Sequence, residues 1–489
     1  MLALGIAGCR HGGDPASARG STLVMAVPDA SVLKPDEWDL DFLTFLPLAT
    51  RNEQGELEGR LAQRWQHSAD FKEWTYHLRT DVHWDDGRPV TARDVKFTLD
   101  LLGHPAIAAY PGINATVVDD VTVRIRAAKP HYIDDIVYYP EHLLRSLDPG
   151  KFWEWAFWTH PVGNGPFRVL RYLPDRLIEF ETNPGYYKGR PRIERVILKF
   201  VGEASLTELL SGNVDVARGE PSQVPRIASD RRFSIYNSVA PGAYPIYWKI
   251  EHPLFRDPRV RRALVHSLDR RELLRVLNLP EEAPITDAVL TLRQLRRREW
   301  PEPLLYDPAG ARTLYAAAGW VDRNRDGVLE KDGRPFRFTV SVGNGFGLEK
   351  VAVYVQAQLR RAGVQMDIRV FDESVMWDKL RAGDFEAWLY VHQPTSLRRD
   401  FGRGNPLGYA NPAVFELIDR LQQTADPNEE DRIYRKISDV FQTDPPMVRL
   451  LPGSRVWFAH RRIRGLSSPF RASADTHMED LWVEDATGR

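Results

Sequence analysis

The sequence predicts an α/β protein in which mixed sheets are flanked by helices. Three observations lead to this fold class. After about residue 330, short stretches with strand patterning alternate with longer stretches of helical periodicity, as in βαβ units. Residues 71–84 alternate apolar and polar side chains, which indicates a half-buried strand. With 489 residues, 43% of them hydrophobic, the chain is long enough for about two or three domains.

In the first half of the chain, strands and short helices are expected between frequent turns. Residues 23–27 are uniformly apolar and predict a buried strand that ends at Pro28. A turn over residues 85–87 leads into a helix whose first turn Thr91 and Asp94 would cap reciprocally. The remaining expected elements of this half are strands over residues 117–125, 177–181 and 214–217 and a short helix over residues 206–210.

The second half begins near residue 244 and carries the longer helices. Residues 308–318 have apolar side chains at helical spacing and stop at Gly319, whereas residues 364–370 alternate strictly, as a strand does. The expected order is a strand at 246–250, a helix or helix pair at 258–277, a helix at 308–318, a strand at 336–342, a helix at 349–362, a strand at 364–370, a helix at 373–382, a strand at 385–391, helices at 411–424 and 427–442, and a strand at 448–451.

The composition excludes several classes of protein. The 66 basic and 67 acidic residues give a formal net charge of -1, which argues against a nucleic-acid binder. No stretch approaches the ~18 consecutive apolar residues that a membrane-spanning helix needs. The single cysteine, Cys9, excludes an internal disulfide, a cysteine-based zinc site and an iron–sulfur cluster.

Motifs that carry catalysis or hold cofactors are missing from the sequence. It has no G-x-S-x-G, H-E-x-x-H or Walker A pattern, and its 13 histidines never recur at i, i+4 spacing within one helix. The glycine-rich stretch 343–347 has Leu348 where a dinucleotide fingerprint has its third glycine, so a loop after a strand is expected there. We therefore expect no catalytic residues, no cofactor and no metal, and turn or cap roles for the acidic pairs at 85–86, 119–120 and 134–135.

One segment leaves a metal site open as an alternative. Residues 322–327 follow the first six positions of an EF-hand loop, but Gly333 stands where that loop has its bidentate glutamate. A β-hairpin with Asp-Gly turns accounts for the same residues, because Asp332 and Gly333 form a second turn just before a strand.

The N-terminus resembles the lipobox of bacterial lipoproteins. An aliphatic residue and two small ones, Ile6, Ala7 and Gly8, precede Cys9, and a period-free stretch rich in small residues follows. The apolar run before them is short and has no basic start, which a start codon placed too late would explain. We expect residues 1–21 to be a signal and lipobox remnant with a tether, with Cys9 lipidated; the alternative is a frayed terminus that carries an incidental thiol.

Further along, an ordered series of segments resembles the peptide/nickel class of bacterial extracellular solute-binding proteins, family 5. Each piece is modest, but their order is specific and covers roughly residues 22–470. The segments are LAQRW at 61–65, WTYHLR at 74–79, HWDDGRPVTARDV at 83–95, PVGNGPF at 161–167, NPGYY at 183–187, LSGNVD at 210–215, FRDPRVRRAL at 255–264, AGW at 318–320 and PPMV at 445–448.

This resemblance implies a two-lobed periplasmic-binding-protein-like fold with an extra third domain. Lobe I would combine residues 22–50, 162–245 and 455–489, the extra domain residues 51–161, and lobe II residues 246–454. Such a protein closes over its ligand and delivers it to the permease and ATPase subunits of an ABC importer. The resemblance implies a non-enzymatic, monomeric, periplasmic or extracytoplasmic protein, lipid-anchored to the membrane, that binds a small solute, most often a peptide.

The ligand site implied by the resemblance lies where the strand at 385–391 ends. Peptide-binding members have an acidic residue in the following loop, and here that loop has no acid at the usual place. Asp400 would replace it if the loop bends back, and Arg398, Arg399 and Arg403 would bind a carboxylate or phosphate if they face the site. The candidate ligand-binding residues are Trp248, Trp388, His392, Gln393, Arg398, Arg399 and Asp400.

Several alternatives stay open at this point. The solute could be anionic or a metal chelate, and the same fold could serve a surface sensor that takes no part in transport. The aromatic segment 152–158 fits either a cleft wall or a core. Strand alternation requires that one of Tyr247 and Trp248 faces inward, without deciding which.

Overall fold

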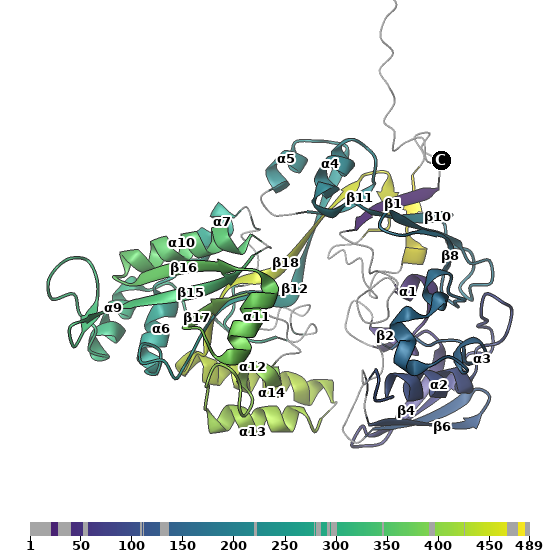
Figure 1. The fold of residues 1–489 in the computed structure, drawn as a ribbon, viewed down its shortest axis with the longest axis horizontal. Helices are drawn as coiled ribbons and strands as arrows, with labels where there is room; N and C mark the ends of the chain where they lie inside the picture. The colour runs from purple at the N-terminus through teal and green to yellow at the C-terminus, as the bar shows by residue number, and fades with distance from the viewer. Residues whose placement is uncertain are drawn as a thin grey trace, which may run out of the picture.

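A ten-stranded mixed sheet has the strand order β16-β15-β17-β12-β18-β11-β1-β10-β9-β8. The computed structural model describes residues 21–27, 41–51, 57–107, 110, 112–127, 136–219, 223–277, 279, 285–290, 294, 301–344, 347–390, 397–424, 426–466 and 478–484. Figure 1 shows two lobes at the ends of this sheet, joined by β12 and β18, and a third unit next to one of them. We call the end with β8–β11 and β1 the first lobe and the end with β15–β17 the second lobe.

In the first lobe, β1 lies parallel to both β10 and β11, while β9 pairs antiparallel with β8 and β10. Apolar residues of β1 alternate between two cores, with Leu23 and Met25 on one face and Val24 and Ala26 on the other. A strand buried on both faces has this uniformly apolar sequence. The elements are β1 (Thr22–Val27), β8 (Phe167–Leu173), β9 (Leu177–Thr182), β10 (Arg195–Phe200), β11 (Val216–Gly219), α4 (Ser205–Leu210), α5 (Val224–Ala228), β19 (Ile463–Arg464) and β20 (Trp482–Val483).

The third unit is a four-stranded antiparallel sheet, in the order β4-β5-β7-β6, with α2 packed on it. Trp74, Tyr76 and Leu78 of β5 are buried in its core, as their alternation predicts. The elements in and around this unit are α1 (Asp41–Thr44), β2 (Ala49–Arg51), β3 (Leu57–Gly59), β4 (Ala62–His67), β5 (Glu73–Leu78), α2 (Ala92–Leu102), β6 (Ile113–Asp119), β7 (Thr122–Ala127), α3 (Glu141–Leu144) and the 3-10 helices η3 (Pro149–Glu154) and η4 (Ala156–Thr159).

The second lobe is a three-layer unit. Its parallel strands β16, β15 and β17 continue into β12 and β18, and helices cover both faces of the sheet. Helices α6, α9 and α10 contribute to the core on one face, and α11–α14 to the core on the other. The elements are α6 (Pro258–His266), α7 (Arg270–Val276), α9 (Pro308–Ala317), β15 (Arg337–Gly343), α10 (Leu348–Arg361), β16 (Gln365–Phe371), α11 (Glu373–Ala382), β17 (Ala387–Leu389), α12 (Leu397–Phe401), α13 (Pro412–Leu421) and α14 (Pro427–Thr443).

Two long strands, β12 (Phe233–Trp248) and β18 (Met447–His460), connect the lobes. They pair antiparallel along almost their full length, from Phe233 opposite His460 to Tyr247 opposite Met447. The register shifts between Ala240 and Ala243 and again after Tyr244, at the level of residues 449–453 of β18. Bulges of this kind change the twist and direction of a strand, so the ladder bends where it passes from one lobe to the other.

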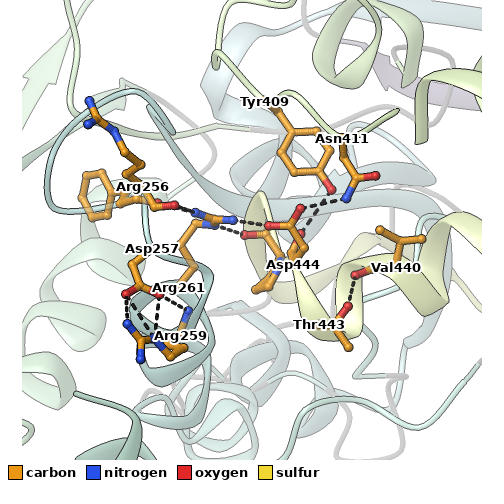
Figure 2. A network of polar contacts seen from close by, with 11 residues as sticks. Arg256, Asp257, Arg259, Arg261, Tyr409, Asn411, Val440, Thr443 and Asp444 are labelled. Atoms are coloured by element: carbon orange, nitrogen blue, oxygen red, sulfur yellow. Dashed lines mark hydrogen bonds and ion pairs between the residues drawn. The ribbon is translucent and has the colours of Figure 1, made fainter. Parts of the chain in front are cut away.

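The start of β18 is fixed by a buried arginine, as Figure 2 shows. Arg261 of α6 donates from Nε to the carbonyl of Pro445 at 2.8 Å and forms an ion pair with Asp444. Asn411 holds the other carboxylate oxygen of Asp444 at 2.9 Å, and the Tyr409 hydroxyl donates to the Asp444 carbonyl at 3.3 Å. Burial lowers the pKa of Arg261, but these acceptors compensate its charge. Two of the segments that carry the family resemblance, 255–264 and 445–448, thus meet here.

Local sequence signals match the structure at several places. Thr91 and Asp94 form the expected capping box, with the Thr91 amide donating to the Asp94 carboxylate at 2.8 Å. The hairpin expected at the Asp332–Gly333 turn is formed by β13 (Glu330–Lys331) and β14 (Arg334–Pro335), and Asp332 and Gly333 take positive φ values of 52° and 72°. The turn at residues 322–327 lies before it and is closed by an antiparallel bridge between Val321 and Glu330. The helix pair expected over 258–277 is α6 and α7.

Two predicted strands were too long. Residues 117–125 form the end of β6, a turn and the start of β7, because the Asp119 carboxylate accepts a hydrogen bond from the Val121 amide at 2.9 Å and closes the turn. The strand expected over 71–84 is β5 alone, at Glu73–Leu78, since Phe71 has a positive φ of 55°. The alternating pattern continued through both turns and concealed them.

Candidate ligand-binding site

The parallel strands β15 and β17 end side by side in the second lobe, and α10 and α12 are the helices that follow them in the chain. In open α/β sheets, ligands bind outside the carboxyl ends of parallel strands. Gly343, the last residue of β15, lacks a side chain where a Cβ would lie 3.0 Å from the Tyr390 ring and 3.1 Å from the Met376 sulfur. The end of β15 therefore leaves room for an aromatic ring just beyond β17.

Four aromatic rings form a continuous group at this edge. Trp388 of β17 stacks on Tyr247 of β12 at 5.4 Å and on Tyr390 at 5.9 Å between ring centroids. Trp377 of α11 meets Trp388 and Tyr390 edge-on, at 5.2 and 5.5 Å. The indole nitrogen of Trp388 lies 3.0 Å from the Met376 sulfur. Edge-to-face and offset contacts hold aromatic rings in fixed orientations, so this aromatic group is rigid. Tyr247 and Trp388 are buried within it, and Trp377 and Tyr390 are half-buried.

A buried carboxylate adjoins the aromatic group. Asp400 of α12 is 3% exposed and accepts 2.7 and 3.3 Å hydrogen bonds from Arg399 and a 3.3 Å bond from the Tyr247 hydroxyl. The guanidinium of Arg399 also lies 5.5 Å from the centre of the Trp377 ring. Burial and the neighbouring Asp400 charge raise the pKa of Tyr247 well above its usual value, so its hydroxyl stays a hydrogen-bond donor.

A further cation, Arg449 of β18, is buried on the same face of the sheet. Arg449 is 5% exposed, and its Nη1 atom has no hydrogen-bond partner in the part of the chain that the structure describes. Burial lowers the pKa of Arg449 to about 10, against the opposing effects of Tyr247 and Asp287. The sequence signal for this residue is an arginine inside the otherwise apolar strand 447–451.

The structure brings some predicted site residues together and separates others. Trp388, Arg399 and Asp400 lie together with Tyr247, whereas Trp248 is 2% exposed in the core on the opposite face of the sheet. The side chain of Arg398 is exposed. Tyr247, which the sequence left open as an alternative to Trp248, belongs to this group, and Trp377, Tyr390 and Arg449 were not among the predicted residues. Predicted positions outside the described residues are Cys9, His392 and Gln393.

The aromatic segment 152–158 belongs to a core. Phe152, Trp155 and Trp158 are buried in the third unit, and both tryptophan indoles donate to backbone carbonyls, at 3.0 and 2.6 Å. The segment reaches the surface at Trp153, which is 37% exposed, and at Glu154 and Ala156. The structure thus favours a core over a cleft wall for this segment.

A second carboxylate, the half-buried side chain of Asp85, lies where the third unit meets the segment that enters the first lobe. The Asp85 carboxylate accepts a hydrogen bond from the Gly163 amide at 2.9 Å, and the Asp85 amide donates to the Gly163 carbonyl at 2.8 Å. Its other oxygen, Oδ1, is buried without a hydrogen-bond partner among the described residues. Burial raises the pKa of Asp85 to about 6.

Two other kinds of feature are absent from the described residues. No group of three or more His, Cys, Asp or Glu side chains there is arranged to hold a metal ion. Within the same residues, no helix has the length and apolar character needed to cross a membrane.

Comparison with known proteins gives one consistent result. The family model described as bacterial extracellular solute-binding proteins, family 5 middle, matches residues 56–408, more than half of the chain. A curated relative, the oligopeptide-binding protein AppA of Bacillus subtilis, is 24% identical over 404 residues, covering 76% of this chain and 73% of AppA.

Solved structures extend this likeness to the fold. AppA of B. subtilis in complex with a nonapeptide has a TM-score of 0.73 at 21% identity, covering 95% of this chain and 99% of AppA. NikZ from Campylobacter jejuni in complex with Ni(L-His) has a TM-score of 0.77 at 22% identity, covering 94% of this chain and 99% of NikZ. Two proteins crystallised with different kinds of ligand thus share the fold of this chain.

Proposed function

This chain belongs to the bacterial extracellular solute-binding proteins of family 5 and is a substrate-binding protein of an ABC importer, and we propose that its solute is a peptide bound between the lobes. The observation that carries this proposal is the pair of strands β12 and β18, which alone among the described strands are shared by both lobes. A connection of this kind lets two lobes close around a ligand. Peptide is proposed because AppA, a relative along most of the chain, is an oligopeptide-binding protein.

We assign the lobes within this proposal by their chain segments. Lobe I comprises residues 22–50, 162–245 and 455–489, the extra domain residues 51–161, and lobe II residues 246–454. The bulged part of the β12–β18 ladder, at residues 240–245, would then be a hinge, and the Asp85–Gly163 contact would link the extra domain to lobe I.

Within lobe II, the proposed contact surface is the aromatic group together with Asp400 and Arg399. The rings would pack against apolar side chains of the solute, and backbone hydrogen bonds to an extended peptide would supply affinity independent of its sequence. Asp400 is already bonded to Arg399 and Tyr247, so a peptide amine would bind there only if Arg399 moves away. Trp248, buried on the other face, has no part in this proposal.

A second candidate solute is an anion or a metal chelate. It is favoured by the local excess of positive charge, since Arg449 is buried beside Tyr247 without a hydrogen-bonded acceptor for its Nη1 in the described part of the chain. NikZ, which shares the fold, was crystallised with Ni(L-His).

The family works outside the cytoplasm together with permease and ATPase components, as a binding protein and not an enzyme. We extend this to a monomer that is tethered to the membrane through a lipidated Cys9 and catalyses no reaction. Incubation of the pure protein with a peptide library should leave every peptide intact; hydrolysis would contradict this part of the proposal.

The experiment that tests the solute is mass spectrometry of the small molecules released when the purified protein is denatured. Peptides in the eluate would support the proposal. Anionic metabolites or chelates would replace it with the second candidate. An eluate without solute, followed by no binding of a peptide library in calorimetry, would contradict a peptide carrier and favour a sensor of the same fold.

A further inference from the structure

We propose that Arg449 binds an anionic group of the solute, a carboxylate in the case of a peptide. This inference rests on the proposed function and adds the chemical class of one part of the solute. It starts from the position of Arg449 in β18. Val448 and Leu450 lie in the core on one face of the sheet, so alternation places Arg449 on the opposite face, with Met447 and Tyr247.

That face of the sheet extends from the core of the second lobe along β12 and β18 toward the first lobe. Arg449 is opposite Pro245 in the ladder, two register positions closer to the first lobe than the Tyr247–Met447 pair. Tyr247 carries the Asp400 contact and stacks on Trp388. The guanidinium therefore belongs to the side of the second lobe that holds the aromatic group, at the end nearest the strands that join the two lobes. Ligands of two-domain proteins bind preferentially at such junctions.

The carboxylates near Arg449 are bound by other groups. Asp287 accepts 2.6 and 3.3 Å hydrogen bonds from Arg270 and a 2.7 Å bond from the Leu304 amide. Asp400 accepts from Arg399 and Tyr247. Arg270 donates to the backbone carbonyl of Arg449, which fixes the strand but gives the Arg449 Nη1 no hydrogen-bond partner among the described residues.

A charge count of these residues leaves one positive charge over. Three arginines, Arg270, Arg399 and Arg449, face two aspartates, Asp287 and Asp400, and the geometry pairs the aspartates with the first two arginines. Buried polar groups are normally hydrogen-bonded, and a buried charge that lacks a hydrogen-bonded counter-charge is unfavourable, so the Nη1 of Arg449 calls for a partner. A guanidinium offers a planar pair of donors that matches a carboxylate or phosphate, so the missing partner is an anion.

The alternative is that Arg449 is only a structural residue of β18. The two roles differ in the ligand-free protein. If Arg449 serves the fold, replacing it by methionine removes a stabilising interaction and lowers the melting temperature. If Arg449 serves to bind an anion of the solute, Arg449→Met removes a buried charge whose Nη1 has no hydrogen bond and keeps most of the side-chain volume. The melting temperature of the ligand-free protein then stays equal or rises.

The test uses the full chain, freed of solute by unfolding and refolding, and a tryptic digest of casein as the probe. Captured peptides are quantified by mass spectrometry for the wild type, Arg449→Met, Arg449→Lys and a control, Arg337→Met. Arg337 is an exposed arginine at the other end of β15, paired with Asp367 at 2.7 Å. The same digest with its carboxyl groups methyl-esterified serves as a second probe.

We expect Arg449→Met to capture at least tenfold less peptide than the wild type, Arg449→Lys an intermediate amount, and Arg337→Met the wild-type amount. Esterification should reduce capture by the wild type and leave that by Arg449→Met unchanged. Equal capture by the wild type and Arg449→Met, or a lower melting temperature of ligand-free Arg449→Met, overturns this inference and leaves the proposed function intact. A wild type that captures no peptide from either digest overturns the proposed peptide function itself.

Discussion

The phenolic hydroxyl of Tyr247 donates a hydrogen bond to the carboxylate of Asp400, a residue 153 positions later in the chain, at 3.3 Å. Tyr247 belongs to a strand that crosses between the lobes, and Asp400 to the short helix after β17. Both are buried. The contact therefore ties the connection at the end of the parallel strands to the part of the sheet that leads to the first lobe.

Loss of the Tyr247 hydroxyl should lower the free energy of unfolding by a measurable amount. Tyr247→Phe removes one buried hydrogen bond and should lower the free energy of unfolding by about 1 kcal/mol, measured by urea denaturation. Tyr315→Phe is a matched control, because the Tyr315 hydroxyl is buried in the same lobe and lies 3.3 Å from Ser267. Both variants should lose similar stability, but only Tyr247→Phe should change solute affinity. Equal affinities for the two variants would argue against a role of Tyr247 in the site.

Neighbouring arginines of α12 should behave differently. Arg399→Ala removes two hydrogen bonds from the buried Asp400 and should cost about 1–3 kcal/mol of unfolding free energy. Arg398→Ala, one position away and exposed, should stay within about 0.5 kcal/mol of the wild type. If α12 lines the site, the double variant with both Arg398→Ala and Arg399→Ala should bind solute more than about tenfold more weakly. That is a loss of ~1.4 kcal/mol of binding free energy, measured by calorimetry. Unaltered affinity would place both side chains outside the site.

The pH dependence of stability should reflect Asp85. Its pKa is raised from 3.8 to about 6 in the folded protein, so the folded state holds a proton more tightly than the unfolded state. Stability is therefore lost as the pH rises from about 4 to about 6. Asp85→Asn removes this loss and should stabilise the protein by about 1–2 kcal/mol at pH 7, with no gain below about pH 4.

A control for this prediction is Asp81→Asn. A hydrogen bond from Arg79 lowers the pKa of Asp81, the opposite direction from Asp85, so neutralising it should bring no gain at pH 7. Thermal melts of the three proteins between pH 4 and pH 8 make the comparison. A difference between Asp85→Asn and the wild type that does not vary with pH would contradict the assignment.

Cellular fractionation tests the proposed lipid anchor. If Cys9 is acylated, Cys9→Ser should move the protein from the membrane fraction to the soluble extracytoplasmic fraction, because a serine cannot accept the thioether-linked lipid. Ser17→Ala, in the same stretch of small residues, should stay with the membrane. Equal partitioning of the two variants would exclude an anchor at Cys9.

Family and fold class could be predicted from the sequence because both depend on local and repeated signals. The Asp119 turn inside residues 117–125 could not, since a hairpin whose two strands alternate in phase gives the same pattern as one longer strand. The choice between Tyr247 and Trp248 also stayed open. Each is buried, on opposite faces of the sheet, because the second lobe has a helical layer on both sides.

The sequence by itself determined the ordered motifs, the α/β class, the capping box at Thr91 and the exclusion of cysteine-based metal chemistry, because each depends on residue types within a few positions of one another. Only the tertiary structure decided which charges are compensated. Arg399 and Arg449 are both arginines in the sequence, but the fold brings one against Asp400 and buries the other with its Nη1 unpaired among the described residues. Electrostatic pairing depends on distances of a few ångströms between segments far apart in the chain, and local sequence carries no record of those distances.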